Sequence, residues 1–589
     1  MKPRMEKEPR MEKKQKTENK CRKRGNEGQA EAAKKRRGFG VWCLLSLAMA
    51  MGACSSKEEK VPPPEESLAV EIVHSTATLT PMETGTYSER STTFMLWVSG
   101  PKADDSVQLK IAPVEGLTFK VESRFEDGLK TFEVSVHYNG KSVFPEGVAT
   151  LQLGLNVPGG QPTTQTLRIA VADGQERERP ILLNQANMEH FNHWANTADG
   201  RWMHYRLTED IVLEPPAPRK SNWRPIGSSA SFAGSLDGGG HNIVGLTMTG
   251  TTESSLGLFA HTHREAVIEN LGLTEVEIEN TSAASVGSLV GVNAGTVQNC
   301  HATGNVSSTD AGTGTVVGGL IGDNGGPVKN CHATVNVRRT GSGNFGKPSH
   351  VGGLIGNSSG PVENCHAEGN VSTFIDKEIV HIGGLIGNST GSVQDCYATG
   401  DVSNTGTGSG TRRIGGLLGL NSSGPVQNSY ATGSVTNTGP GSSIYVGGVV
   451  GHSFGTVQNC YATGSVTNTN TGPDNSICIG GLIGTGEGVT QNSYATGSIT
   501  NTGPGYIIAL GGLIGDGAFI GRGVTQNSYA TGNVTNTGVG SERIFVGGLM
   551  GIGKAQDCYA TGNVSNSGTG TAVFVGGLLG ETALGETMN

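Results

Sequence analysis

Nine aromatic side chains recur at one position of a repeated pattern, and they are the side chains of this sequence best placed to contact a ligand. They are His301, His332, His366, Tyr397, Tyr430, Tyr461, Tyr494, Tyr529 and Tyr559. Rings repeated from strand to strand can bind sugars or proteins, because tyrosine offers both an apolar face and a hydroxyl. They can also stack on one another and stabilise a sheet. The sequence therefore predicts a ligand-binding column here and leaves a purely structural role as the alternative.

Small buried side chains are expected directly before these rings. One repeat position holds Cys300, Cys331, Cys365, Cys396, Cys460 and Cys558, and serine takes the same position at Ser429, Ser493 and Ser528. Six cysteines in an exported chain could form disulfides. Because serine replaces cysteine freely and all six would stand in one in-register column, the pattern favours small buried thiols over disulfides.

Catalytic and metal-binding signatures are missing from the sequence. His190 and His193 lie three apart in a predicted helix, but no third ligand has a recognisable spacing and His-Glu-x-x-His is absent. The repeats contain few Asp or Glu and show no recurring carboxylate pair, which glycosidase chemistry needs. We therefore expect no catalytic residues, no metal and no other cofactor, and we expect that the protein is not an enzyme.

The N-terminus has the pattern of an export signal. Residues 1–53 combine a basic head with the short apolar run Gly38–Ala53, which is typical of a signal peptide. The run ends in Met51-Gly52-Ala53-Cys54, which resembles the lipobox of bacterial lipoproteins. This resemblance implies lipidation of Cys54, with palmitate among the acyl groups, and a lipid anchor in the bacterial outer membrane that leaves the protein exposed at the surface. Residues 54–67 would then be an acylated tether with a proline spacer.

Charge is strongly segregated along the chain. Residues 1–37 contain 15 Lys/Arg and 6 Asp/Glu, whereas the sequence after Ala53 contains 28 basic and 45 acidic residues. Nucleic-acid binding requires clustered cations that neutralise phosphates. The acidic balance of the mature chain therefore argues against a nucleic-acid partner.

Two segments precede the repeats. Residues 68–175 alternate polar and apolar side chains in about seven short runs, as in Phe94–Val98, and this pattern predicts an immunoglobulin-like β-sandwich. Residues 176–255 are expected to form an entry cap and the first rungs of a β-helix. In this cap, residues 184–197 predict a short amphipathic helix that covers the open end of the array.

Residues 256–589 are predicted to form a β-solenoid of repeats. The anchor pattern apolar-Gly-Gly-Leu-Ile-Gly begins at Val286, Val317, Val351, Ile382, Ile414, Val446, Ile479, Leu510, Val546 and Val575. A second block follows most anchors, as in Val457–Val466. Both blocks resemble the GLUG motif, which occurs in bacterial surface proteins and adhesins and in the N-terminal regions of immunoglobulin-A-cleaving metallopeptidases. The expected fold is all-β, with a parallel β-helix after the sandwich.

The second block also predicts how one rung is built. Cys300, Ala302 and Val306 lie on the same face of the strand by parity, and this face should point inward. Gln298 has the same parity, but its position is polar in every repeat and should therefore point outward. A turn at Asn299 with left-handed backbone would reset the phase. Equivalent asparagines would then form an amide ladder along one corner, and the variable loops, with cations such as Arg338-Arg339 and Arg412-Arg413, would lie at the surface.

The sequence favours a non-catalytic function at the cell surface. A lipid-anchored rod with an outward ring column suits an adhesin or extracellular binding protein, whose partner would be a host or bacterial surface glycan or an extracellular protein. A polysaccharide-active β-helix enzyme is the alternative from another class. A non-catalytic fragment of a GLUG-bearing surface metallopeptidase is a further alternative, and the ligand is not indicated.

Overall fold

The structure is a computed structural model of the 589-residue chain. It describes residues 68–582, with gaps at 75–77, 85–86, 159–160, 250–252, 310–313, 343–346, 377–378, 473 and 518–522. The predicted signal peptide, Cys54 and the tether lie outside the described residues. Within the described part of the chain, no helix is both long and apolar enough to span a bilayer.

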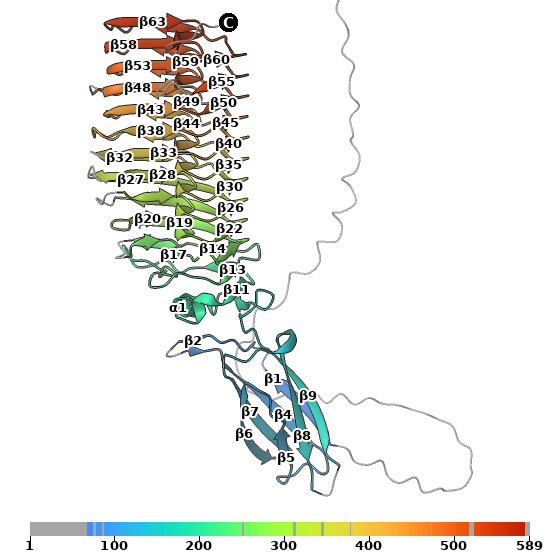
Figure 1. Cartoon of the computed structure of the whole chain (residues 1–589). Helices are drawn as coiled ribbons and strands as arrows, with labels where there is room; N and C mark the ends of the chain where they lie inside the picture. The colour runs from blue at the N-terminus through green and yellow to red at the C-terminus, as the bar shows by residue number, and fades with distance from the viewer. Residues whose placement is uncertain are drawn as a thin grey trace, which may run out of the picture. The chain divides into compact units, whose positions relative to one another are not determined.

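A β-sandwich forms the first part of the described chain (Figure 1). Its four-stranded sheet has the order β1 (Ala69–His74), β4 (Ser91–Ser99), β7 (Leu129–Tyr138), β6 (Leu117–Glu126), and its three-stranded sheet has the order β5 (Gln108–Ile111), β8 (Val148–Asn156), β9 (Thr163–Ala170). All of these pairs are antiparallel. This is the strand order of a constant-type immunoglobulin fold. Side chains such as Leu96, Val134 and Leu151 are fully buried between the sheets.

A short hairpin lies in sequence between β1 and β4 of the sandwich, and a helix follows the sandwich in sequence. The hairpin pairs β2 (Glu83–Thr84) with β3 (Tyr87–Ser88). Helix α1 spans Met188–Trp194 and is shorter than the predicted 184–197. The chain turns away here because Gly200 lies against the carbonyl of Trp194, where a Cβ would be only 2.1 Å from that oxygen.

Helix α1 covers the first strands of the solenoid with aromatic contacts. The ring of Phe191, which is fully buried, lies 4.7 Å from that of Tyr205 in β11 (His204–Leu207). Strand β11 pairs in parallel with β10 (Ile181–Leu183) and β13 (Ser235–Asp237), and these strands begin a sheet that continues through the repeats. The helix side chains therefore belong to the same buried core as the repeats.

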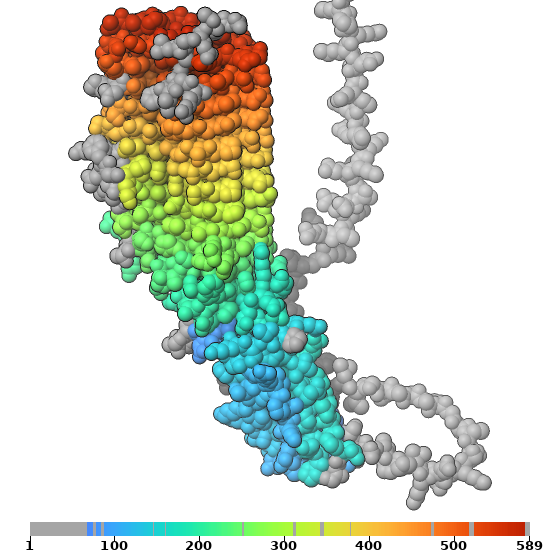
Figure 2. Space-filling view, viewed as in Figure 1, coloured from blue at the N-terminus to red at the C-terminus, as the bar shows by residue number. Residues whose placement is uncertain are grey.

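Each repeat forms one rung of a parallel β-solenoid (Figure 1). A complete rung consists of β28 (Ser349–Gly352), β29 (Ile355–Ser358), β30 (Val362–Glu363), β31 (His366–Ala367) and β32 (Val371–Asp376). Equivalent residues pair from rung to rung, as Val351 does with Ile382 and Tyr397 with Tyr430. In Figure 2 the repeats accordingly follow one another as stacked bands. The prediction of an all-β chain with a sandwich followed by a parallel solenoid is confirmed.

The asparagine corner has the predicted geometry. Asn299, Asn330 and Asn364 adopt φ values of 53°, 54° and 52°, in the left-handed region. The same conformation recurs at Asp395, Asn428, Asn459, Asn492, Asn527 and Asp557. The side-chain amides form a ladder, since Asn364 Nδ2 donates to Asn330 Oδ1 at 2.8 Å and Asn330 Nδ2 donates to Asn299 Oδ1 at 2.9 Å. The predicted change of phase and the amide ladder are both confirmed.

Replacement of Asn364 should separate the two contributions of this corner. Asn364→Ala introduces a residue that resists left-handed backbone and also removes the amide bond, so we expect a loss of about 1–2 kcal/mol in unfolding free energy. Asn364→Gly should recover the backbone part only. Urea unfolding of both variants checks this, with the exposed Gln394→Ala as control. Equal stability of the alanine and glycine variants would contradict the assignment.

The cysteine column is buried except at Cys558 on the last rungs, which is partly exposed, and its thiols are free. Cys365 Sγ donates to the carbonyl of Glu363 at 3.1 Å, and in a later rung Ser429 Oγ makes the equivalent bond to Gln427 at 2.6 Å. Thiol and hydroxyl thus satisfy the same carbonyl two residues earlier, which explains why the two residues interchange. Burial raises the pKa of the Cys460 thiol to about 12, so it stays protonated.

The interchange predicts opposite effects of two substitutions at Cys460. Cys460→Ser should change the unfolding free energy by less than about 1 kcal/mol, because the hydroxyl keeps the bond to the carbonyl of Gln458. Cys460→Val should cost about 1–3 kcal/mol, since it adds volume to a packed column and removes the bond from the thiol, which leaves that carbonyl only its backbone bond from Asn428. Thermal unfolding of the two variants measures the difference, and a serine variant less stable than the valine variant would refute this role.

Candidate binding face

The nine predicted rings form one continuous stack on the outside of the solenoid. Neighbouring ring centroids are 4.5–5.0 Å apart and neighbouring planes are inclined by 2–5°. The stack runs from His301 to Tyr559 without interruption. The structure therefore brings all of the predicted ring residues together in a single column.

Stacking leaves little ring face available to a ligand. Each inner ring has a neighbour above and below, and His301 at the beginning of the stack lies against Gly272, where a Cβ would be 2.6 Å from the imidazole. Of the nine rings, only that of Tyr559, on the last rung, belongs to a residue more than half exposed, at 53%. What the column presents to solvent is a line of ring edges and tyrosine hydroxyls. Hydrogen bonding is the chemistry that such a line can offer.

The histidines of the stack are held in the neutral form. Burial and the neighbouring His366 lower the pKa of His332, and burial and His332 lower the pKa of His301. Neutral rings stack without charge repulsion, which suits the mixed stack of His366 on Tyr397. The histidines thus occupy the same position in the stack as the tyrosines of the later rungs and, like them, contribute an uncharged ring.

Two polar rows run beside the ring stack on the outward side of the same strands. In β23 (His301–Ser308) the outward positions after His301 include Asn305 and Ser307. The first row consists of Asn305, Asn336, Asn370, Asp401 and Ser434. The second row consists of Ser307, Arg338, Ser372, Ser403 and Thr436. Together they line an open groove of about 840 Å³, a size typical of ligand sites.

The first row is fixed by hydrogen bonds from rung to rung. Asn336 Oδ1 accepts from the backbone N–H of Asn370 at 3.2 Å, Asn370 Oδ1 accepts from that of Asp401 at 2.9 Å, and Asp401 Oδ1 accepts from that of Ser434 at 2.8 Å. Each of these side chains uses one oxygen to accept a hydrogen bond from the backbone of the next rung. The amide NH₂ of Asn370 and the second carboxylate oxygen of Asp401 are held in fixed positions at the exposed side of the row. Such a row is ordered before any ligand arrives.

The predicted surface cations are partly inside the molecule, which corrects the expectation for Arg339 and Arg412. Both guanidinium groups are fully buried. Arg412 Nη2 donates to the carbonyls of Gly408 at 2.8 Å and Ile375 at 3.1 Å, so it binds the loop from within. The neighbouring Arg338 is exposed. Parity explains the difference, because adjacent residues of a strand point to opposite faces.

A second polar cluster lies in the corner between two of the long sheets, and sequence reasoning missed it. His350, His381 and Arg413 precede the anchors of three consecutive repeats and pair with one another in register. His452 in β44 (Val450–Ser453) and Glu487 complete the cluster from the facing strands. The signal available in the sequence was the recurrence of ionisable residues immediately before successive anchors.

The cluster is one continuous hydrogen-bond chain around Arg413. Arg413 Nη1 donates to His381 Nε2 at 2.9 Å, and His381 Nδ1 lies 3.1 Å from His350 Nδ1. On its other side Arg413 Nε donates to His452 Nδ1 at 3.3 Å, and His452 Nε2 lies 3.1 Å from Glu487 Oε1. Since both imidazoles accept from the guanidinium, both are neutral. Burial lowers the pKa of His350 to about 4 and that of His452 to about 3.

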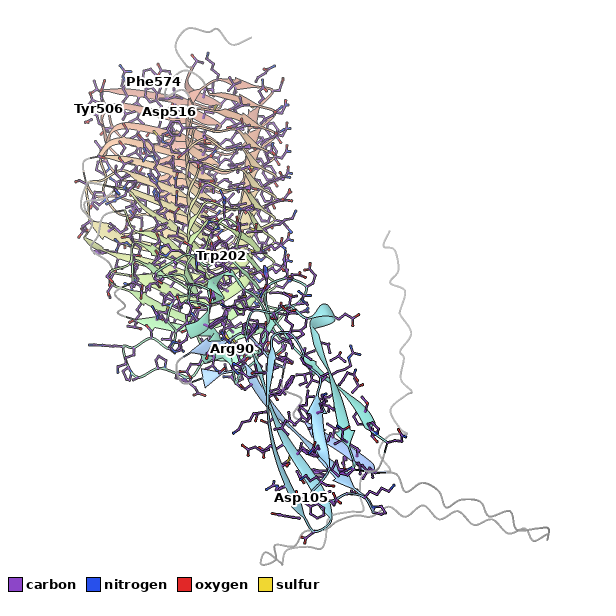
Figure 3. All side chains as sticks on the ribbon, turned by 60° about the horizontal axis from the view of Figure 1, so that its bottom comes forward. Arg90, Asp105, Trp202, Tyr506, Asp516 and Phe574 are labelled. Carbon is purple, nitrogen blue, oxygen red and sulfur yellow. The ribbon has the colours of Figure 1, made fainter. Side chains whose placement is uncertain are left out.

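The array continues beyond this cluster with other buried groups. Asp516 is only 8% exposed, and it contributes with burial to a raised pKa of the Cys478 thiol. Tyr506, in contrast, is 49% exposed, and Figure 3 shows it at the margin of the array. In the part of the chain that the structure describes, no three His, Cys, Asp or Glu side chains gather as a metal site. His193 is exposed and His190 is half-buried in α1.

Comparison with known proteins identifies the repeat. The model of the GLUG motif matches residues 282–307, 348–372, 380–403 and 442–467. Over 129 residues the chain is 35% identical to a "Putative Gly-rich membrane protein" of Evansella cellulosilytica, covering 21% of this chain and 14% of that protein. Over 123 residues it is 32% identical to "Halomucin" of Haloquadratum walsbyi, covering 20% of this chain and 1% of that protein.

The two relatives are therefore matched over a small part of their length. Among solved structures, a "putative immunoglobulin A1 protease" from Bacteroides ovatus is similar with a TM-score of 0.35 and 20% identity, over 50% of this chain and 79% of that chain. The four matched segments contain the anchors and asparagine corners described above. Four repeats of the chain thus match the GLUG motif, and the repeats stack as the rungs of a parallel β-solenoid.

Proposed function

We propose that this protein is a lipid-anchored protein of the bacterial cell surface that binds an extracellular ligand through the outer face of its repeat array, without catalysis. This proposal rests on one observation. Polar side chains occupy the same outward positions in successive strands, and because the strands pair in register these side chains form rows that can hydrogen-bond a ligand. The interior of the array consists mainly of apolar side chains, thiols and amides, and its buried guanidinium groups and imidazoles already bond to partners within the protein. Ligand recognition is therefore assigned to the outer face.

Two further facts support a surface location. The relatives are described as a Gly-rich membrane protein and as halomucin, names that refer to membrane and mucin-like proteins. The N-terminal sequence combines a signal-peptide pattern with Cys54 at the end of a lipobox-like run. A host or bacterial glycan, or an extracellular protein, is the proposed partner class.

The anchor can be tested apart from binding. Cells that express the full chain should incorporate radiolabelled palmitate into it, and Cys54→Ala should abolish the label. Cys43→Ala, within the apolar run, is the matched control and should keep the label. Labelling that survives in the Cys54→Ala variant would show that the anchor assignment is wrong.

Binding can be tested with the mature chain displayed on beads. We expect displayed protein to adhere to surfaces coated with extracellular polysaccharide or matrix protein, and we expect no release of reducing sugar or peptide fragments. A bead that carries only the sandwich, residues 68–175, is a comparison for non-specific adhesion. Absence of adhesion to every surface, or ligand cleavage, would contradict a non-catalytic binding role.

A further inference from the structure

We propose that the groove formed by the Asn/Asp row and the Ser/Thr row is a binding site for a linear, uncharged polysaccharide that lies along the solenoid axis. The groove rows are defined as the two rows that begin at Asn305 and Ser307. This inference rests on the proposed binding function and adds the site and the ligand class. It begins from the repetition of the groove, which presents equivalent groups on five successive rungs.

The repetition of the site points to a repetitive ligand. A compact small molecule would contact one or two rungs, and the equivalent groups on the others would stay unused. A linear polymer laid parallel to the axis meets two polar side chains on every rung. They are an amide or carboxylate with a hydroxyl on three rungs, an amide with Arg338 on one, and two hydroxyls on another. Adjacent rungs are about 4.8 Å apart, a spacing of the same order as the length of one sugar residue. A polysaccharide is one polymer whose own groups repeat at such short intervals, and the chemistry of the lining distinguishes it from a peptide.

The chemistry of the lining points to hydroxyl groups on the ligand. Asn370 and Asn336 provide amides, and Ser372, Ser403 and Thr436 provide hydroxyls, which are the groups that donate to and accept from sugar hydroxyls. The groove floor contains the buried Val306, Val337 and Val402.

The charge of the lining points to an uncharged polymer. Among the residues that line the groove there is one cation, Arg338, and one anion, Asp401, on rungs two apart. A polyanion such as a polyuronate, a sulfated glycan or a nucleic acid would meet one favourable and one unfavourable charge, and binding would gain nothing overall from the charges. Both groups can instead hydrogen-bond sugar hydroxyls.

The geometry of the row favours binding by preorganisation. Asn370 and Asp401 each use one oxygen to hold the backbone N–H of the following rung. Their remaining hydrogen-bonding groups are therefore oriented by the scaffold, so a ligand does not have to order them. These two side chains, in the middle of the groove, should contribute most to the affinity.

The test measures binding of defined oligosaccharides to the full mature chain by calorimetry. The panel contains neutral gluco-, manno- and galacto-oligosaccharides, with oligogalacturonate as the charged comparison. We expect saturable binding of at least one neutral series, with affinity that increases with chain length. Asn370→Ala together with Ser372→Ala should weaken it about tenfold or more, which is the loss of one or two hydrogen bonds. Asp401→Asn should weaken it less, because an amide still bonds to hydroxyls.

Gln394→Ala, which lies on another sheet, is the matched control and should leave binding unchanged. Circular dichroism and unfolding midpoints of all variants distinguish a lost contact from a misfolded rung. Preference for oligogalacturonate, or equal binding by wild type and the double variant, would overturn the proposal. If beads still adhere to natural surfaces in that case, the binding function stands and this site is wrong. If neither beads nor oligosaccharides bind, both proposals fail.

Discussion

Acidification from pH 7 to pH 4 should destabilise the repeat array steeply, because the unfolded chain then binds protons at histidines that the folded protein keeps neutral near Arg413. The folded pKa of His350 is about 4 and that of His452 is about 3, against 6.5 for an exposed histidine. Between these values the unfolded chain binds more protons than the folded one. The contribution of these histidines to the free energy of unfolding is therefore complete above about pH 6.5 and decreases as the pH falls below that value.

The unfolding free energy should change steeply with pH although only a few side chains titrate. Each such histidine should contribute about 1.4 kcal/mol per pH unit, and the loss should level off near pH 4 for His350 and near pH 3 for His452. His381, whose pKa burial and its neighbour His350 also lower, should add to the slope. The charged groups that face the cluster are Arg413 and Glu487, with Tyr445 and Asp516 on the following rungs.

A glutamine in place of His452 should flatten this pH dependence. A carboxamide can accept from Arg413 Nε and donate to Glu487 Oε1, as the neutral imidazole does, but it does not titrate. We therefore expect His452→Gln to reduce the slope by about 1.4 kcal/mol per pH unit. Urea unfolding at a series of pH values measures this, with the exposed His74→Gln as control. An unchanged slope in the His452→Gln variant, or the same change in the control, would contradict the role of the cluster.

Gly416→Ala should be among the most damaging single substitutions in the array. Gly416 is the second glycine of its anchor, and a Cβ there would lie 2.1 Å from the carbonyl oxygen of Gly448 and 2.9 Å from the Cβ of Ala431. The neighbour is backbone of the next rung, which cannot rotate away. Separation of the two rungs should cost about 3 kcal/mol, at the upper end of overpacking effects.

The last rung contains a matched control for this clash. Gly577 occupies the equivalent anchor position, and a Cβ there would meet no heavy atom within 4 Å. Gly577→Ala should therefore change stability by less than about 0.5 kcal/mol. Limited proteolysis and urea unfolding of the two variants give the comparison. If both substitutions are equally tolerated, close stacking is not why the anchor requires glycine.

The repeat architecture was predictable because it is periodic. The positions of Asn299, Cys300 and Val306 hold Asn or Asp, Cys or Ser, and an apolar residue in the later repeats. They define the corner, the buried small position and the core, and the structure places each of them as expected. Local backbone preference and parity were sufficient for these features. The amide ladder followed from the same corner, since a side chain fixed in every rung must meet its equivalents.

The exterior was less predictable because it depends on how neighbouring rungs differ. Arg339 and Arg412 were expected at the surface, but they lie in β27 (His332–Ser342) and β38 (Arg412–Gly415), at strand positions whose side chains point inward. His452 and Glu487 join Arg413 only because two sheets meet at a corner, and they lie far from it in sequence. The sequence also left the orientation of the rings open, and the structure places them face to face.

Photoaffinity mapping of a bound glycan would test most directly the claim that the outer polar rows are the functional surface. A neutral oligosaccharide with a diazirine group would be bound to the full mature chain, irradiated and located by mass spectrometry of the cross-linked peptides. We predict cross-links in the peptides that contain Asn336, Asn370 and Asp401, reduced by excess unlabelled sugar. Cross-links concentrated on the sandwich or on the loops near Tyr506, or none that the free sugar reduces, would contradict it.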